Sequence, residues 1–475
     1  MELMIPIKVQ SGVPLYDQIY GYLKKEIKKG SLPPLTKLPS TRVLAENLKV
    51  SRSTTQMAYE QLVSEGYVEV FPCRGYYVAK IEELVEVSPA VGGDFSFGMA
   101  EESAAYQIDF SPRGIDFNHF PYNAWRKVTR NTLVDDNKQM FLTGNPQGEP
   151  ALREAICGYL HSARGVNCHA EQMIVGAGSE YLLMLLYQIL GSERTIAMEN
   201  PTYKQAYRVF ESLGYRVTPI EMDAYGLQVS KLEQSGAEIA YVMPSHQYPM
   251  GIVMPIKRRQ ELLGWAGKQA NRYLIEDDYD SEFRYKGKPI PALQGMDGGG
   301  NVIYMGTFSK SIAPAIRISY LVLPMSLLEV YQKKVSFYAS TVSRIDQNVI
   351  YQFLVGGYYE RHLNRMRAIY KAKHDVLVAQ LRALETQFQI KGEYAGLHVL
   401  LTDQAGRSEA WLIEKAQQVG VCVYGLSAYF IHPQHNSYPS TVVLGYATLD
   451  EEQIKTGIAL LKQAWMLSDS KGDGA

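Results

Sequence analysis

Apolar residues recur at helical spacing through most of the first 65 residues and at strand spacing directly after them. The segment 15–29 places Leu, Ile and Tyr residues about one turn apart, which predicts a helix. Ser40 and Ser51 each precede a further helical segment and are suitable N-caps. Strand-like stretches follow at 66–70 and 76–79. Two short helices joined by a tight turn and followed by a hairpin predict a winged helix-turn-helix. The expected inward positions of the short helices are Val43, Leu44, Leu48, Ala58, Leu62 and Val63.

From about Ile108 onward, short apolar strands alternate with amphipathic helices. The strand-like segments are 173–175, 195–198, 239–242, 273–275 and 302–305, and each ends in polar or Gly/Pro residues. This alternation predicts an α/β domain with a mainly parallel sheet and ligands at the carboxyl ends of the strands. The most apolar run, 181–190, is about half the length of a membrane span, so we expect a buried helix there and no membrane insertion.

Composition and charge divide the chain in the same way. It has 475 residues, 46 % hydrophobic and 20 % charged, which is typical of globular proteins of more than one domain. The net charge of −1 argues at first against nucleic-acid binding. However, residues 1–80 hold 11 Lys and Arg against 7 Asp and Glu, a net +4, while the remainder holds 37 against 42, a net −5. We expect a basic domain over 1–80, a linker over 81–107 and an α/β domain over 108–475.

The four cysteines lack the spacing of a metal site or a disulfide framework. Reduced thiols and no bound metal are therefore expected. The N-terminus has no basic segment followed by a long apolar one, so a cytoplasmic location is predicted.

The first domain resembles the winged helix-turn-helix of GntR-type bacterial regulators over most of residues 12–80. In that family the start of the third helix enters the major groove, and the wing approaches the minor groove. The resemblance implies double-stranded operator DNA as partner, with contacts from Arg42, Ser51, Arg52, Ser53, Thr54, Gln56, Arg74 and Gly75. Arg suits guanine or phosphate, hydroxyl groups suit phosphate, and Gln suits adenine. The alternative is a winged helix that contacts protein, with these side chains merely solvated.

Three strand ends of the second domain carry candidate chemistry. Gly176 to Ser179 precedes a helix whose N-terminal amides suit a phosphate, although such turns are often simple connections. The acidic run 276–280 suits a metal, a cationic ring or plain solvation. Lys310 follows Thr307-Phe308-Ser309, with Arg317 seven residues beyond. A lysine among hydroxyls and an arginine suits a Schiff base beside a phosphate, or is an ordinary exposed lysine.

Together these segments resemble fold-type I aminotransferases dependent on pyridoxal phosphate, over nearly all of residues 108–465. Residues 144–148 and 152–156 match an early segment of that family, and 244–251 matches the loop that contacts the ring oxygen. The loop contains His246 and Gln247 in place of the usual Asn-Pro-x-Gly form.

The resemblance implies pyridoxal 5'-phosphate as cofactor. Lys310 would form the Schiff base, Asp277 would pair with the pyridinium nitrogen, Tyr279 would hydrogen-bond the phenolate oxygen, and Tyr203 would stack on the ring. The residues implied around the phosphate are Gly178, Ser179, Thr307, Ser309 and Arg317. The chemistry needs the Lys310 amine to be unprotonated, so its pKa must lie below the reference value of about 10.4.

A winged helix joined to such a domain is the layout of the MocR (GabR-like) subfamily of GntR regulators. This resemblance implies a transcription factor that senses a small amino compound through external aldimine formation at Lys310. It also implies a head-to-tail homodimer. The alternative is an active aminotransferase with an appended winged helix.

The sequence departs from the best-known member, a sensor of γ-aminobutyrate that holds the ligand carboxylate with two arginines. Gln205 and Ala428 stand at those two positions, and neither replaces an arginine fork. We therefore predict that γ-aminobutyrate is not the effector. The effector pocket expected around Gln205, Ala428 and Tyr429 leaves room for a dipeptide, a D-amino-acid derivative or an amine, and we favour a peptide-like amino compound. Alternatively, Lys204, His432 or Tyr429 takes over carboxylate binding.

Overall fold

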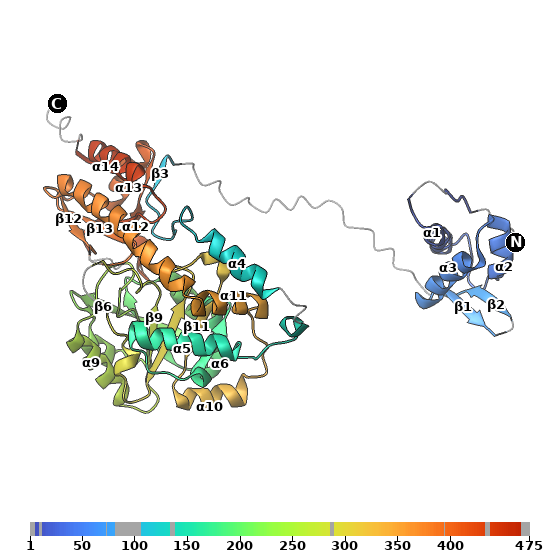
Figure 1. Ribbon diagram of the computed structural model, residues 1–475, viewed down its shortest axis with the longest axis horizontal. Coiled ribbons are helices and arrows are strands. Elements are labelled where there is room, and N and C mark those ends of the chain that lie inside the picture. The colour runs from blue at the N-terminus through green and yellow to red at the C-terminus, as the bar shows by residue number, and fades with distance from the viewer. Residues whose placement is uncertain are drawn as a thin grey trace. The chain divides into compact units, whose positions relative to one another are not determined.

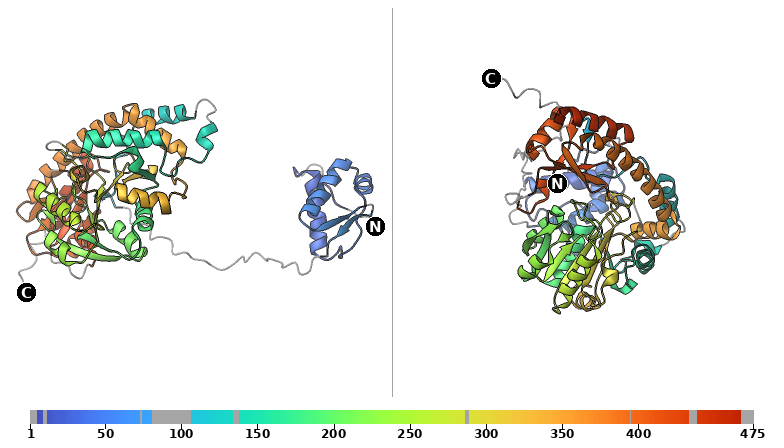
Figure 2. Two further views of the ribbon diagram at one scale, coloured as in Figure 1. Left: turned by 90° about the horizontal axis from the view of Figure 1, so that it is seen from below. Right: turned by 90° about the vertical axis from the view of Figure 1, so that its left-hand side faces the viewer.

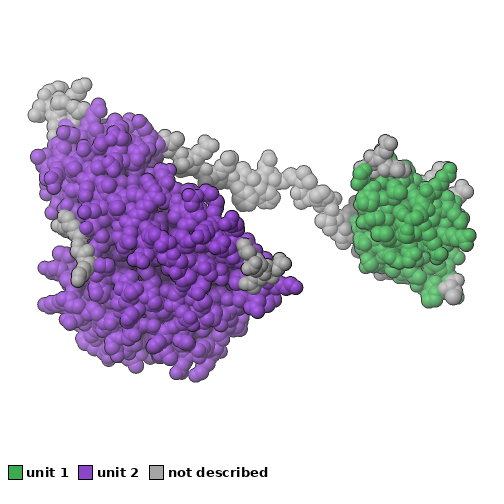
Figure 3. Space-filling model, viewed as in Figure 1, with its two compact units in different colours: residues 1–103 green, residues 104–475 purple. Residues whose placement is uncertain are grey.

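The computed structural model describes residues 5–8, 12–72, 74–80, 106–133, 138–285, 289–393, 395–432 and 438–466. The chain forms two compact units, Met1–Ser103 and Ala104–Ala475 (Figure 3). Most of the expected linker, 81–105, lies outside the described residues.

The first unit contains three helices and a hairpin (Figure 1). The helices are α1 (Leu15–Lys28), α2 (Thr41–Leu48) and α3 (Arg52–Ser64), and the antiparallel hairpin pairs β1 (Val68–Phe71) with β2 (Gly75–Val78). Ser40 and Ser51 cap α2 and α3, because their hydroxyls accept hydrogen bonds from the third residue beyond each. The predicted winged helix-turn-helix is therefore confirmed.

The core of this unit lies where the three helices meet. Leu44, Ala58 and Leu62 are fully buried there, as predicted. The prediction for Val43 is wrong, because its side chain is 46 % exposed. On a helix of only two turns, Leu44 and Ala45 already fill the inward face, and Val43 falls outside it.

The second unit is built on an eight-stranded sheet in the order β4-β11-β10-β9-β8-β5-β6-β7. Its strands are β4 (Met173–Gly176), β5 (Thr195–Asn200), β6 (Arg216–Asp223), β7 (Gly226–Leu227), β8 (Ile239–Val242), β9 (Tyr273–Asp278), β10 (Val302–Thr307) and β11 (Ser319–Val322). The five central strands from β10 to β6 are mutually parallel, and β11, β4 and β7 make the antiparallel pairs. The predicted mainly parallel α/β sheet is confirmed.

Helices cover both faces of this sheet (Figures 1 and 2). One face of the sheet is covered by α6 (Ser179–Leu190), α7 (Lys204–Ser212) and α10 (Met325–Lys334). On the other pack α5 (Pro150–Arg164), α8 (Val229–Gln234), α9 (Ile256–Gly267) and α11 (Arg344–Val355), with α4 (Tyr122–Thr132) against α11. Because side chains alternate along each strand, both faces have their own buried core. The apolar run 181–190 forms the buried part of α6.

A smaller antiparallel sheet in the order β12-β13-β16-β15 completes the unit. Its strands are β12 (Phe388–Lys391), β13 (His398–Asp403), β15 (Tyr424–Gly425) and β16 (Thr441–Gly445). It packs with α12 (Tyr358–Leu381), α13 (Glu409–Gln418) and α14 (Glu451–Met466). The chain enters this region through β3 (Ile108–Asp109), which pairs with β14 (Val421–Cys422).

Candidate functional site

Lys310 lies in the loop after β10, where several strand ends meet. Asp277 is the last residue but one of the neighbouring parallel strand β9, and the turn after β4 opens α6 at the same edge. The Lys310 amine donates to the backbone carbonyl oxygens of Pro112 and Arg113, at 3.2 and 2.7 Å. Burial lowers the pKa of Lys310 to about 8, although the Asp280 carboxylate acts in the opposite direction. Roughly a quarter of the amine is then unprotonated at pH 7.5.

Asp277 is 5 % exposed, and its carboxylate accepts a hydrogen bond from the Tyr241 hydroxyl on the adjacent strand β8. Burial raises the pKa of Asp277 to about 7, against the effect of that hydrogen bond. A buried carboxylate is suited to pair with a cation, because a nearby positive charge would offset the free-energy cost of removing the carboxylate from water.

The rest of the acidic run has other partners. Glu276 accepts from the backbone amides of Leu293 and Gln294, each at 2.8 Å. Asp278 forms a buried ion pair of 2.9 Å with Arg164. The solvated alternative for this run is therefore wrong for residues 276–278, which are at most 6 % exposed.

The Tyr279 hydroxyl lies beside a buried histidine. His246 Nδ1 is 3.0 Å from that hydroxyl and 2.9 Å from the Asp280 carboxylate. A carboxylate only accepts, so we place the proton on Nδ1. Burial first, and then Asp280, raises the pKa of Tyr279 well above its ordinary value. The side-chain amide of Gln247 instead donates to the backbone carbonyls of Pro201 and Tyr248.

The Arg317 side chain lies at the start of α6. A Cβ added to Gly178 would lie 2.1 Å from Arg317 Nη2, so only glycine allows the guanidinium this close. Arg317 itself has φ +52°, a left-handed conformation that is strained for a side chain of this type. Its guanidinium donates to the Glu180 carboxylate at 2.6 Å. Burial acts to raise the pKa of Glu180, but the ion pair with Arg317 outweighs it and lowers that pKa.

The hydroxyl residues predicted around the phosphate contribute differently to the site. Ser179 is the first residue of α6, where backbone amides have no intrahelical partner. The Thr307 hydroxyl accepts from the Ser309 amide at 3.1 Å and from the Ser319 hydroxyl at 2.8 Å. Thr307 thus fixes the loop that carries Ser309 and Lys310.

Three tyrosines, of which Tyr203 lies within electrostatic reach of Asp277 and Arg317, contact one another near the site. Tyr203 contacts Tyr248 edge-on, with ring centroids 6.1 Å apart, and the Tyr248 and Tyr429 hydroxyls are 3.2 Å apart. Of the expected effector-pocket residues, Tyr429 is buried, whereas Gln205 and Ala428 are exposed.

The predicted DNA-contacting residues of the first unit gather around the start of α3. Arg42, Ser51, Arg52, Ser53 and Gln56 are exposed. The Ser51 hydroxyl is 2.7 Å from those of both Ser53 and Thr54. Arg42 pairs with Glu46 and Gln56 with Glu60, each one turn along its own helix. Such exposed pairs are worth at most about 1 kcal/mol and can give way to DNA.

The wing presents Arg74 on the hairpin turn. Arg74 is exposed, and its backbone amide donates to Phe71 across the turn at 3.0 Å. Gly75 follows at φ +102°, a backbone conformation suited to glycine.

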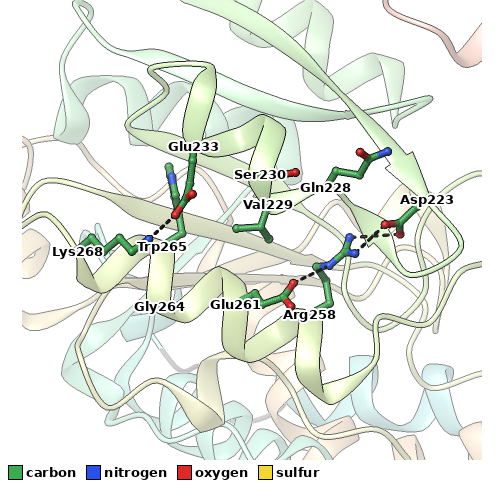
Figure 4. A pocket seen from close by; sticks show the side chains of 10 residues that line it. All are labelled: Asp223, Gln228, Val229, Ser230, Glu233, Arg258, Glu261, Gly264, Trp265 and Lys268. Carbon is green, nitrogen blue, oxygen red and sulfur yellow. Dashed lines mark hydrogen bonds and ion pairs between the residues drawn. The ribbon is translucent and has the colours of Figure 1, made fainter.

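A separate surface groove lies between α8 and α9 (Figure 4). Its charged side chains pair with one another: Arg258 with Asp223 and Glu261, and Lys268 with Glu233. None of the predicted site residues lines it.

The described ranges contain no group of three or more His, Cys, Asp or Glu side chains placed to hold a metal ion. No helix in those ranges is long and apolar enough to cross a membrane.

Sequence reasoning missed four residues that complete the site. They are Tyr241, which contacts Asp277; Asp280, which contacts His246; Glu180, which pairs with Arg317; and Arg113, whose carbonyl contacts Lys310. Asp280 lay in the acidic run already noted, but nothing local distinguishes Tyr241 within an apolar strand.

Comparisons with known proteins match both units. Residues 15–78 match the gntR family of bacterial regulatory proteins, and residues 114–461 match class I and II aminotransferases. The chain is 40 % identical to the HTH-type transcriptional regulator YdeL of Bacillus subtilis, over 96 % of this chain and 97 % of the relative. It is 32 % identical to the "Probable rhizopine catabolism regulatory protein MocR" of Rhizobium meliloti, over 99 % and 97 %.

A solved structure shares the fold of the second unit. The multiple substrate aminotransferase of Thermococcus profundus superposes with a TM-score of 0.68 at 24 % identity, over 76 % of this chain and 92 % of that one.

Proposed function

This chain belongs to the MocR type of GntR-family transcriptional regulators, and we propose that it senses a small amino compound at Lys310 and changes its binding to operator DNA in response. One observation carries this proposal. A lysine with its pKa lowered to about 8 lies at the strand ends that also bear Asp277 and the start of α6.

The residues around Lys310 fit pyridoxal 5'-phosphate. Gly178 is closed to any side chain by Arg317, which keeps a guanidinium against the helix start where a phosphate would bind. Asp277 offers a buried carboxylate to a protonated ring nitrogen, and the Tyr279 hydroxyl, beside His246, would donate to a ring oxygen. Tyr203 borders the site and would cover one face of the ring. The bound cofactor would supply an aldehyde carbon that accepts a primary amine.

The protein's own groups then have distinct tasks. Lys310 would supply the amine that holds the cofactor's aldehyde carbon, and this amine would be released when the effector's amine takes its place. The lowered pKa of Lys310 favours the unprotonated amine that such bonding needs. Tyr241 holds Asp277 in place through a hydrogen bond, and Thr307 fixes the loop bearing Lys310.

We propose that the effector is not γ-aminobutyrate. Gln205 and Ala428 supply no cation, and we propose that the smaller side chain at Ala428 leaves room for a peptide-like or D-amino-acid derivative. Titration of the cofactor absorbance with γ-aminobutyrate should give no saturation in the micromolar range. Micromolar saturation would contradict this part of the proposal.

We propose that operator DNA is contacted by the start of α3, by Arg42 and by the wing. A net charge of +4 per head is small, so useful affinity requires two heads on one operator, consistent with a head-to-tail homodimer. Such a regulator acts in the bacterial cytoplasm.

A regulator is favoured over an active aminotransferase because the relatives matched across nearly the whole chain are regulators. Two assays on the same preparation separate these functions: retention of specific DNA and sustained formation of a keto product from an amine. A regulator retains DNA in an amine-dependent manner and forms at most traces of product. Sustained turnover without any DNA response would contradict it.

A further inference from the structure

The loop 110–116 brings Arg113 to the reactive lysine. The carbonyl oxygens of Pro112 and Arg113 accept hydrogen bonds from Lys310 Nζ at 3.2 and 2.7 Å. The backbone of Arg113 therefore lies at the amine that the proposed function makes reactive.

This loop is fixed at both ends. The Phe110 carbonyl accepts from the Gly445 amide at 2.8 Å, and the buried Asp116 carboxylate accepts from Lys373 at 2.7 Å. In between, a Cβ on Gly114 would lie 2.2 Å from Thr448 Cγ2, which shows how closely the loop is packed. The location of Arg113 beside Lys310 is thus set by the fold.

The Arg113 side chain itself is exposed, and within the described ranges its guanidinium has no hydrogen-bond or ion-pair partner. Its charge acts to lower the pKa of Lys310 and of Tyr203, Tyr248 and Tyr429, secondary in each case to burial. The guanidinium is therefore within electrostatic reach of the groups that surround the site. Arg317, by contrast, is already paired with Glu180.

We propose that Arg113 binds a carboxylate of the effector while the effector's amine reacts at Lys310. The inference rests on the proposed function and deepens it. A guanidinium offers a planar pair of donors matched to a carboxylate, and this one replaces the contacts that Gln205 and Ala428 do not provide. The effector class is then an amino compound bearing a carboxylate, such as an amino acid or a dipeptide, rather than a simple amine.

The first test uses the full-length holoprotein and three probes: D-alanine, D-alanyl-D-alanine and ethylamine, the last lacking a carboxylate. Dissociation constants are read from the cofactor absorbance. We expect Arg113→Ala to weaken binding of the carboxylate probes at least about tenfold, equal to about 1.4 kcal/mol, and ethylamine less than twofold. Arg113→Lys should be intermediate, because the charge remains and the fork is lost.

Lys204→Ala is the matched control, since it removes a nearby cation from α7. It should leave all three constants unchanged. Selective loss of the carboxylate probes in this variant would overturn the assignment. Three results in Arg113→Ala would also overturn the assignment. They are an equal loss of affinity for all three probes, no loss of affinity for any of them, and weaker binding of the cofactor itself.

A second measurement tests carboxylate binding at Arg113 even if none of the three probes changes the cofactor absorbance. The rate at which trinitrobenzenesulfonate labels Lys310 in the cofactor-free protein is followed against pH, with and without propionate. Propionate bound at Arg113 places a negative charge near Lys310, so it should raise the pH midpoint of the Lys310 labelling rate in the original protein. It should not raise that midpoint in Arg113→Ala. The same response in both proteins would refute the inference. Failure of the original protein to bind pyridoxal phosphate would instead refute the proposed function.

Discussion

The two units place their functional side chains in opposite environments. In the first unit the Arg42 side chain is 78 % exposed, and Arg52 and Ser53 are exposed too. In the second unit Asp277 and His246 are 5 % and 3 % exposed. Contacts to DNA need charges that stay hydrated until the polyanion arrives, and their strength falls steeply with salt. Chemistry at an amine needs desolvation, because burial is the largest of the effects that lower the pKa of Lys310 to about 8.

This contrast predicts that the two activities separate by mutation. Lys310→Ala removes the reactive amine, so covalent attachment of pyridoxal phosphate and every response to amines should be lost completely. The variant should bind operator DNA without effector as the original protein does, since α3 is in the other compact unit. Absorbance and an electrophoretic DNA shift measure the two properties. DNA binding that still responds to an effector after this change would refute sensing through Lys310.

The pH dependence of Lys310 tests the buried side of the contrast. The unprotonated amine is the reactive form, and a pKa of about 8 makes it roughly 300-fold more abundant at neutral pH than a pKa of 10.5 would. The rate of cofactor attachment should rise with pH and level off above about pH 8. A midpoint near pH 10.5 would show that Lys310 is solvated. The absorbance change after mixing gives the rate at each pH.

The exposed side of the contrast is tested by Arg52→Ala. If Arg52 contacts a base edge, specific binding should weaken by about 1–3 kcal/mol, roughly 5- to 150-fold, and sequence preference should relax. Lys25→Ala in α1 is the control, because it also removes one exposed positive charge. Fluorescence anisotropy with specific and scrambled duplexes measures both variants. Equal losses in the two variants would show that only bulk charge matters.

A smaller effect is expected at the Glu180–Arg317 ion pair. Glu180→Gln removes a negative charge beside the phosphate position and releases the guanidinium, so cofactor affinity should increase about three- to tenfold. Glu154→Gln on the exposed face of α5 is the control with the same charge change. Equilibrium titration with pyridoxal phosphate gives both constants. Weaker binding in Glu180→Gln would mean that Glu180 orients Arg317.

Local signals were enough for much of the fold. The caps at Ser40 and Ser51 marked the starts of α2 and α3, and apolar runs marked five strands of the large sheet, because capping and burial are properties of a few adjacent residues. The prediction that Val43 is buried was wrong, because on a short helix several positions lie about equally close to the inward face.

The site was predictable only as far as its residues share a segment. Lys310, Ser309 and Thr307 are neighbours in sequence, so their proximity followed directly. The partners of residues 276–280 could not be predicted from the sequence. Arg164 and Tyr241 lie on elements far away in the sequence, which contact this run only in the folded domain. Arg113 is a single arginine in a loop, and its significance comes from the carbonyl contact with Lys310 about 200 residues away, at 2.7 Å.

The central claim is that chemistry at Lys310 and binding at α3 are coupled. It is tested by one titration of the holoprotein with an amino compound, in which cofactor absorbance and anisotropy of labelled operator DNA are recorded together. We predict that both signals change over the same concentration range, with little keto product. A cofactor signal that saturates while DNA binding stays constant would contradict it.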